Sequence, residues 1–219
     1  MPDDSPNRLA AFHDLEPALE DFGAAVIAGL ASTPKTLPCK FFYDQKGSQI
    51  FDQICDLAEY YPTRTEIGLL EAKSAEMAEL FGPACHVIEF GSGSSVKIRI
   101  LLGALDAPAG YTALDISRDH LLQAAESLAV AYPDVPVAAV CADFTRPFDL
   151  PDVFEGAARR LGFFPGSSIG NFTRVEAAGF LEASRKILTG PDAGFLVGVD
   201  LRKDPAILNA AYNDAKGVT

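Results

Sequence analysis

The amino-acid sequence predicts an α/β protein with a doubly wound, mostly parallel sheet and a helical N-terminal region. Residues 1–85 contain apolar residues at helical spacing but no convincing strand. From residue 86 onward, short and almost continuously apolar runs alternate with helical patterns. Strands of this kind, separated by helices, are typical of a parallel sheet that is covered on both faces. We therefore expect a helical region over residues 1–85 and a ligand-binding core over residues 86–219.

The N-terminal region is expected to be built from helices. Residues 16–30 carry apolar side chains at helical spacing. Residues 47–82 are expected to form two helices divided near Pro62, because the residue before a proline avoids helical angles. The aromatic and turn-rich stretch LPCKFFYDQKGS, residues 37–48, lies between these segments.

The core is expected to contain five strands that alternate with helices. The strands are expected within residues 86–90, 111–117, 135–144, 161–172 and 193–201. The helices are expected over residues 94–105, 117–131, 174–188 and 205–217. Thr173 and Glu176 have capping-box spacing before the third helix, while Asp204 and Pro205 begin the last helix and Gly217 ends it. Ligands in such sheets bind beyond the carboxyl ends of the strands, so the residues after each strand are the site candidates.

The composition indicates a soluble, acidic protein of the cytoplasm. Hydrophobic residues make up 48% of the 219 residues, and the formal net charge is −12 with a pI near 4.6. This charge argues against a nucleic-acid partner, because neutralising phosphates needs a basic surface. No signal peptide is visible, and no apolar run approaches the roughly 18 residues of a membrane helix. We therefore expect no nucleic-acid or membrane partner. A monomer is also expected, although nothing in the sequence reports the oligomeric state.

The cysteines and histidines do not predict a metal site. The cysteines are scattered without a CxxC pair, which fits buried thiols in a reducing compartment. The histidines lie far apart and lack a ligand spacing such as HExxH. We therefore expect no metal.

The loop after the first predicted strand, EFGSGSSVK, is shaped for a ligand without a pyrophosphate. Gly91 and Gly93 match the first two glycines of the dinucleotide pattern G-x-G-x-x-G, but Val96 stands at the third. The P-loop pattern fails as well. Glycines let the chain turn tightly and let a ligand approach the backbone. The alternative is a plain turn between a strand and a helix.

Carboxylates follow the next two predicted strands. Asp115 lies 24 positions after Gly91, near the distance of about 20 at which nucleotide folds place the acid that binds ribose hydroxyls. Asp115 could instead cap the following helix, although Ser117 could take that role. Asp143 can accept a hydrogen bond from an exocyclic amine, and Phe144 can lie against a purine. The alternative for this pair is a turn carboxylate beside a core phenylalanine.

Taken together, these strand ends favour an adenosine-type ligand that lacks phosphates. S-adenosylmethionine fits this description better than NAD or ATP. The loop after the fourth predicted strand, FFPGSSIGNFT, borders the same crevice, where a methyl acceptor would lie. Its Asn171 has an amide that can both donate and accept hydrogen bonds, although it could equally be an ordinary loop residue.

Six stretches of the chain are long and specific enough to indicate a family. They are KFFYDQKGSQIFDQI, EYYPTRTE, EFGSGSSVKIRILL, ADFTRP, FFPGSSIGNF and GVDLRKDPAILNAAYNDAKGVT. Over about residues 37–219 the chain resembles the S-adenosylmethionine-dependent histidine Nα-methyltransferases of ergothioneine biosynthesis. The resemblance implies a Rossmann-like methyltransferase fold, S-adenosylmethionine as cofactor, and methylation of the α-amine of L-histidine to trimethylhistidine.

The resemblance also implies which residues hold the cofactor. Asp115 would bind the ribose, and Asp143 with Phe144 would hold the adenine. The glycine loop and the lysine shortly after it would contact the cofactor. The implied cofactor-binding residues are Gly91, Gly93, Lys97, Asp115, Asp143 and Phe144.

On the acceptor side, the resemblance assigns Tyr43 and Asn171 to catalysis, because they would lie next to the substrate amine. Asn171 would also bind the amino acid, and Tyr212 its carboxylate. The EYYPTR motif supplies another substrate-binding tyrosine. Tyr60 is favoured for this role, and the adjacent Tyr61 stays open. Packing within a helical region is the alternative for Tyr43, Tyr60 and Tyr61.

The family's chains continue past Thr219 with further strands and a segment that reads the imidazole of histidine. Its sheet usually has seven strands, whereas five are predicted here. The sequence is therefore expected to be the N-terminal part of such a chain, with an incomplete core. Two other functions stay open: methylation of another small amino acid or amine, and a truncated, non-catalytic module that binds the cofactor.

Overall fold

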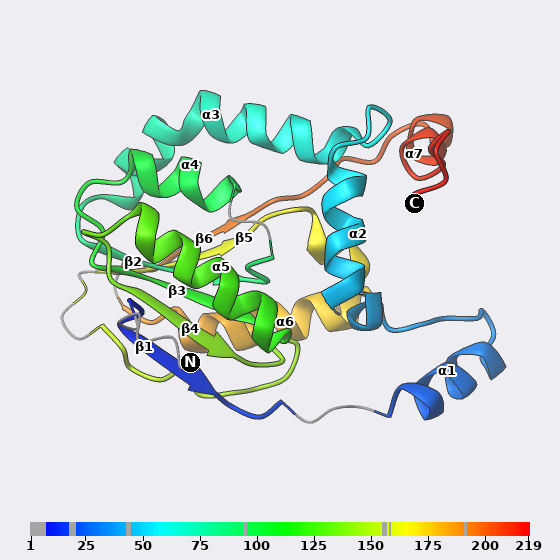
Figure 1. Cartoon of the computed structure of the whole chain (residues 1–219), viewed down its shortest axis with the longest axis horizontal. Coiled ribbons are helices and arrows are strands. Elements are labelled where there is room, and N and C mark those ends of the chain that lie inside the picture. The colour runs from blue at the N-terminus through cyan, green and yellow to red at the C-terminus, as the bar shows by residue number, and fades with distance from the viewer. Residues whose placement is uncertain are drawn as a thin grey trace, which may run out of the picture.

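A computed structural model of the chain describes residues 8–17, 21–42, 45–93, 96–154, 157, 159–190 and 192–219 (Figure 1). Its centre is a six-stranded sheet in the order β1-β4-β3-β2-β5-β6, and every pair of neighbouring strands is parallel. The strands are β1 (Ala11–Asp14), β2 (Cys85–Phe90), β3 (Gly110–Asp115), β4 (Val137–Cys141), β5 (Arg159–Phe164) and β6 (Gly194–Val197). The predicted α/β fold with a parallel sheet is confirmed.

The expectation that residues 1–85 contain no strand is wrong, because β1 forms one edge of the sheet. It runs parallel to β4, from Ala11 opposite Ala138 to Asp14 opposite Cys141. Two flanking backbone hydrogen bonds, from Ala10 and Leu15 to β4, extend the pairing. β1 has only four residues, none of them buried, so it lacks the continuous apolar run that identified the other strands. Its hydrogen-bonding partner is far away in the sequence, and tertiary context of this kind overrides local pattern.

The helices are α1 (Phe22–Ala31), α2 (Gln45–Cys55), α3 (Tyr61–Phe81), α4 (Val96–Ala104), α5 (Arg118–Ala131), α6 (Arg174–Ile187) and α7 (Pro205–Ala211), with short 3-10 helices η1 (Cys39–Phe42) and η2 (Ser168–Asn171). The predicted capping box of Thr173 and Glu176 is confirmed at the start of α6. Pro62 occupies the first turn of α3, where a proline is tolerated, and the chain leaves the helical path before it.

The predicted end of the last helix at Gly217 is wrong, because α7 stops at Ala211. The physical reason lies in Asp214. Its carboxylate accepts hydrogen bonds from the backbone amides of Lys216, Val218 and Thr219. A side chain that satisfies these amides offers the backbone an alternative to the helical ladder.

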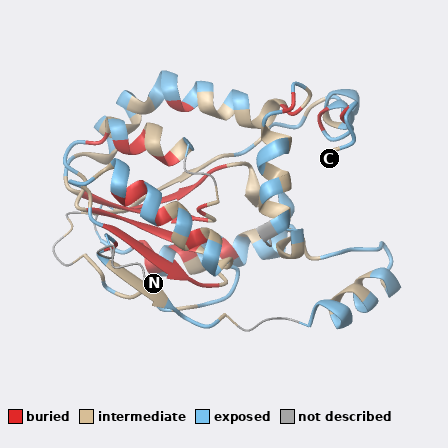
Figure 2. Ribbon diagram, in the orientation of Figure 1, coloured by how far each residue is buried: buried red, intermediate tan, exposed pale blue. Residues whose placement is uncertain are grey.

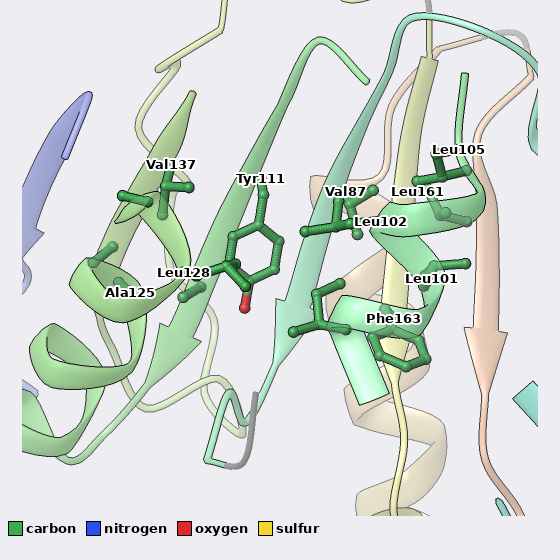
Figure 3. Close-up of a cluster of buried hydrophobic side chains, with 14 of the residues drawn as sticks. Val87, Leu101, Leu102, Leu105, Tyr111, Ala125, Leu128, Val137, Leu161 and Phe163 are labelled. Carbon is green, nitrogen blue, oxygen red and sulfur yellow. The ribbon is translucent and has the colours of Figure 1, made fainter. Parts of the chain in front are cut away.

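Helices cover both faces of the sheet, as doubly wound topology requires (Figure 1). On one face, α3, α4 and α5 bury a cluster with strand residues such as Val87, Tyr111 and Phe163 (Figure 3). On the other face, α6 packs on Ile88 and Phe90. Successive strand residues thus serve opposite cores, which is why the central strands are buried along their length (Figure 2).

Helix α1 has no buried residue. Figure 1 shows it apart from the sheet, joined to η1 by an extended segment. It begins at Phe22 rather than near residue 16, where Asp21 caps it by accepting a hydrogen bond from the amide of Ala24 at 2.9 Å.

Candidate active site

A cavity of about 470 Å³ opens at the carboxyl ends of the strands. The register places these ends level, with Phe90 opposite Leu114 and Asp115 opposite Cys141. Residues that follow β2, β3, β4 and β5 all contribute to its wall. Its volume lies within the range of small-molecule sites, and its position is the one expected for ligands of open α/β sheets.

The glycine loop after β2 forms one side of this cavity. Gly91 has a φ of +78°, a conformation that favours glycine, and a Cβ there would lie 3.6 Å from the ring of Phe144. The carbonyl of Gly93 accepts a hydrogen bond from Nε2 of His120 at 2.7 Å. Both glycines line the cavity, and so does His120 on α5, a residue that sequence reasoning did not single out.

Asp115 lies at the end of β3 and lines the cavity. Its Oδ1 accepts a hydrogen bond from the amide of Ser117 at 2.8 Å, while Ser117 makes no side-chain cap bond at the start of α5. Burial raises the pKa of the Asp115 carboxyl. One oxygen of Asp115 thus supports the helix start, and the residue also lines the cavity.

Asp143, two residues after β4, carries a buried oxygen in need of a donor. Its Oδ1 accepts from the amide of Thr145 at 3.1 Å. Within the described part of the chain its Oδ2 has no hydrogen-bond partner, although Lys40 Nζ and Arg146 Nε approach to 3.7 and 3.6 Å. An unpaired buried acceptor is costly, so this oxygen is suited to a ligand that donates a hydrogen bond.

Phe144 belongs both to the cavity wall and to the core. It lines the cavity, and its ring lies edge-on to Phe90 and Phe164, with centroids 6.1 and 5.9 Å apart. These rings belong to the aromatic cluster under α6, which also contains Phe180. Phe144 is therefore a cavity wall held in place by the core.

Lys97, in the first turn of α4, also lines the cavity. Its ammonium lies 2.6 Å from Oε2 of Glu66 on α3. The same carboxylate accepts a hydrogen bond from the amide of Gly166 at 2.9 Å, in the loop after β5. Sequence reasoning did not single out Glu66, which lies at the end of the EYYPTRTE motif.

Glu89 on β2 is a second residue that sequence reasoning missed. It is 2% exposed, lines the cavity, and accepts a hydrogen bond from the hydroxyl of Tyr111 at 2.5 Å. Burial raises the pKa of Glu89 from 4.5 to about 8, so this side chain holds a proton at neutral pH. The available signal was an acid inside the apolar strand HVIEF.

The structure separates the two adjacent tyrosines. Tyr60 is 5% exposed, lines the cavity, and packs edge-on against Tyr212 with ring centroids 5.5 Å apart. Tyr61 donates a hydrogen bond to Asp200 and lines a smaller pocket of about 250 Å³. Lys203 pairs with the same carboxylate and lies over the Tyr61 ring. Of the pair, Tyr60 faces the main cavity.

The remaining acceptor-side candidates come from other parts of the chain. Asn171, the last residue of η2, and Tyr212, directly after α7, both line the cavity. Tyr43 lies outside the described residues. The cavity therefore gathers Tyr60, Asn171 and Tyr212 opposite the strand ends.

The part of the chain that the structure describes contains no group of three or more His, Cys, Asp or Glu side chains placed to hold a metal ion. Across those same residues, no helix combines the length and the apolar character needed to cross a membrane.

Comparison with known proteins gives a consistent set of relatives. The family described as "Histidine-specific methyltransferase, SAM-dependent" matches residues 22–219. The chain is 42% identical over 215 residues to a histidine N-alpha-methyltransferase of Mycolicibacterium smegmatis, covering 96% of this chain and 65% of that protein. It is 36% identical over 190 residues to ergothioneine biosynthesis protein 1 of Neurospora crassa, covering 85% of this chain and 22% of that protein.

A more distant relative has a different name. The chain is 33% identical over 204 residues to the 4-dimethylallyltryptophan N-methyltransferase ifgB of Penicillium roqueforti, covering 88% of this chain and 59% of that protein. The chain thus spans less than two thirds of the length of each of these three relatives. The family match extends over almost the whole described chain, from α1 to the C-terminal residue. This chain belongs to the SAM-dependent, histidine-specific methyltransferase family.

Proposed function

We propose that this protein binds S-adenosylmethionine at the carboxyl edge of its sheet and methylates the α-amine of L-histidine to trimethylhistidine, a step of ergothioneine biosynthesis. The observation that carries the proposal is the buried Oδ2 of Asp143, which accepts no hydrogen bond from the described residues and lies in a cavity shared with Gly91 and Asp115. That oxygen suits an adenine amine, and the same cavity offers no arginine or P-loop for phosphates among its described lining residues. We further expect the protein to act as a cytoplasmic monomer on a small-molecule amino acid.

The strand-end residues fit an adenosine. Asp143 accepts from the exocyclic amine, and Phe144 lies against the purine. Asp115 accepts from the ribose hydroxyls with the oxygen that Ser117 leaves available. Gly91 and Gly93 keep side chains away from the ligand, and Lys97 is suited to the negatively charged carboxylate at its methionine end.

On the acceptor side, the residues have to hold an amino acid in line with the methyl donor. When bound, S-adenosylmethionine supplies an electrophilic methyl group on a sulfonium. Asn171 and Tyr43 would orient the amine, while Tyr60 and Tyr212 would enclose the amino acid. Alignment of the reacting atoms is the main requirement of such a displacement. The α-amine has to lose its proton before it attacks, and water that reaches the open cavity can take this proton.

A second candidate function is N-methylation of another amino acid. It is supported by the relative named for 4-dimethylallyltryptophan, which matches 88% of this chain at 33% identity. The cofactor half of the cavity would be the same in both cases, and the acceptor half would differ.

The test is an acceptor screen with S-adenosylmethionine carrying a deuterated methyl group, followed by mass spectrometry of the products. We expect up to three labelled methyl groups on L-histidine and none on tryptophan derivatives. Asn171→Ala should lower the rate at least tenfold. Asn209→Ala, an exposed asparagine on α7, is the matched control and should act like the unmodified protein. Methylation of a tryptophan derivative alone would favour the second candidate, and binding of S-adenosylhomocysteine without any product would favour a non-catalytic module.

A further inference from the structure

We infer that Glu66 is a positioning residue. It holds Lys97 toward the cofactor and links Lys97 to the loop after β5, which leads to Asn171. This inference rests on the proposed function, since it assumes that Lys97 meets the carboxylate end of S-adenosylmethionine. Glu66 lies in the second turn of α3 and is absent from the wall of the main cavity. It therefore acts through the residues that it holds.

The carboxylate of Glu66 joins two elements that carry opposite halves of the site. Its Oε2 lies 2.6 Å from the ammonium of Lys97 on the cofactor side. Both of its oxygens lie 2.9 Å from the amide nitrogen of Gly166, which begins the loop that leads to Asn171. Gly166 has a φ of +83°, so the loop turns sharply at the residue whose amide donates to Glu66.

The surroundings of Glu66 leave it little freedom. Its side chain is 19% exposed and that of Lys97 is 13% exposed. Gly198, directly after β6, approaches so closely that a Cβ there would lie 2.0 Å from Oε1 of Glu66. The end of β6 thus accepts no side chain at this place while the carboxylate keeps its position.

Stability alone gives a weak reason for this arrangement. Burying two charges costs desolvation energy that the attraction between them often fails to exceed. An ammonium on a four-carbon stem is flexible, however, and a fixed carboxylate reduces the number of positions that it can take. Glu66 therefore serves to hold the Lys97 ammonium at one place on the cavity wall.

The experiment compares two ligands by calorimetry. S-adenosylhomocysteine has the amino-acid carboxylate, whereas 5′-methylthioadenosine has the same adenosine and lacks that carboxylate. We expect Glu66→Gln to weaken binding of S-adenosylhomocysteine about tenfold and to change binding of methylthioadenosine less than about twofold, the effect of losing one charge-assisted hydrogen bond. Lys97→Met should weaken only the first ligand as well, and the double variant should bind it no worse than Lys97→Met.

The matched control is Glu76→Gln on the same helix. Glu76 pairs with Lys73 at 2.7 Å, but these side chains are 62% and 57% exposed and lie away from both pockets. This variant should bind both ligands like the unmodified protein. If Glu66→Gln does not fold, Glu66→Asp, which keeps the charge on a shorter side chain, is judged by the same difference between the two ligands.

Three results would overturn the inference. If the Glu66 variant binds S-adenosylhomocysteine with unchanged affinity, Glu66 has no such role. If its affinity falls equally for both ligands, the effect is a general structural one. If the losses of affinity add up in the double variant, Glu66 does not act through Lys97. Failure of the unmodified protein to bind either ligand would instead overturn the proposed function, and this inference with it.

Discussion

The two halves of the cavity are built in different ways. In the half that we propose for the cofactor, Gly91, Asp115 and Asp143 lie at or just after the ends of three neighbouring strands of one parallel sheet. In the half that we propose for the acceptor, Tyr60 precedes a helix of the N-terminal region and Tyr212 follows the helix α7. The first half is positioned by the register of backbone hydrogen bonds. The second depends on how separate helices and loops pack against one another.

This difference determines which parts of the site can be predicted from the sequence. Parallel strands end at the same edge, so residues after them meet there whatever the intervening sequence is. No comparable rule brings Tyr60 next to Tyr212, whose rings touch across 152 positions of sequence. Substitutions in the sheet-based half and in the helix-based half should therefore differ in their effects.

The largest expected effect concerns Glu89, which reports how dry the cofactor half is. Burial raises the pKa of Glu89 from 4.5 to about 8 in the folded state. Between these values the unfolded chain has released a proton that the folded chain still holds. The stability of the fold should therefore decrease by about 1.4 kcal/mol per pH unit between pH 4.5 and 8, and change little with this group outside that window.

Glu89→Gln should remove this part of the pH dependence and make the fold more stable than the unmodified protein at pH 7.5. Urea unfolding at pH 5.5, 6.5 and 7.5 measures the difference between the two proteins. Glu76→Gln, at an exposed position on α3, should leave the slope unchanged. If the free energy of unfolding depends on pH in the same way in both proteins, Glu89 is hydrated at the strand end and its pKa is not raised.

The next effect concerns Asp115 in the cofactor half. Asp115→Ala removes a carboxylate that we expect to bind two ribose hydroxyls, so the Kd for S-adenosylhomocysteine should rise about 100-fold. The KM for histidine at saturating cofactor should change much less. Asp119→Ala, which changes an exposed acid in the first turn of the following helix α5, is the control. A loss of affinity under threefold for Asp115→Ala would argue that this carboxylate only supports the helix start.

The smallest effect separates the two tyrosines of the acceptor half. Tyr60→Phe removes a hydroxyl from the cavity and should reduce kcat/KM for histidine about tenfold, with little change in S-adenosylhomocysteine binding. Tyr61→Phe removes the hydrogen bond to Asp200 and should lower the free energy of unfolding by about 1 kcal/mol. Steady-state kinetics and urea unfolding of both variants measure these quantities. The opposite pattern, with catalysis lost in Tyr61→Phe, would exchange their roles.

The sheet could be predicted from the sequence because its central strands are buried on both faces and read as apolar runs. The edge strand β1 was not predicted, because its four partly exposed residues form no apolar run and pair only with the distant strand β4. The end of α7 escaped because Asp214 captures backbone amides, a contact between side chain and backbone that periodicity does not reveal.

Within the site, the strand-end residues were predictable from position, while the acceptor residues came from resemblance to a family. Glu66 and Glu89 were missed for a physical reason. Each is an acidic residue whose role depends on a partner far away in the sequence, Lys97 for the first and Tyr111 for the second. Their spacing carries no motif for such a contact.

The central claim is that an adenosine lies against the ends of β2, β3 and β4. Photoaffinity labelling with 8-azido-S-adenosylhomocysteine, followed by peptide mapping, tests this most directly. We expect cross-links in the peptides that contain Gly91 or Asp143 and Phe144, and excess S-adenosylhomocysteine should suppress them. Labelling confined to α1 or α7, or labelling that the competitor does not reduce, would contradict it.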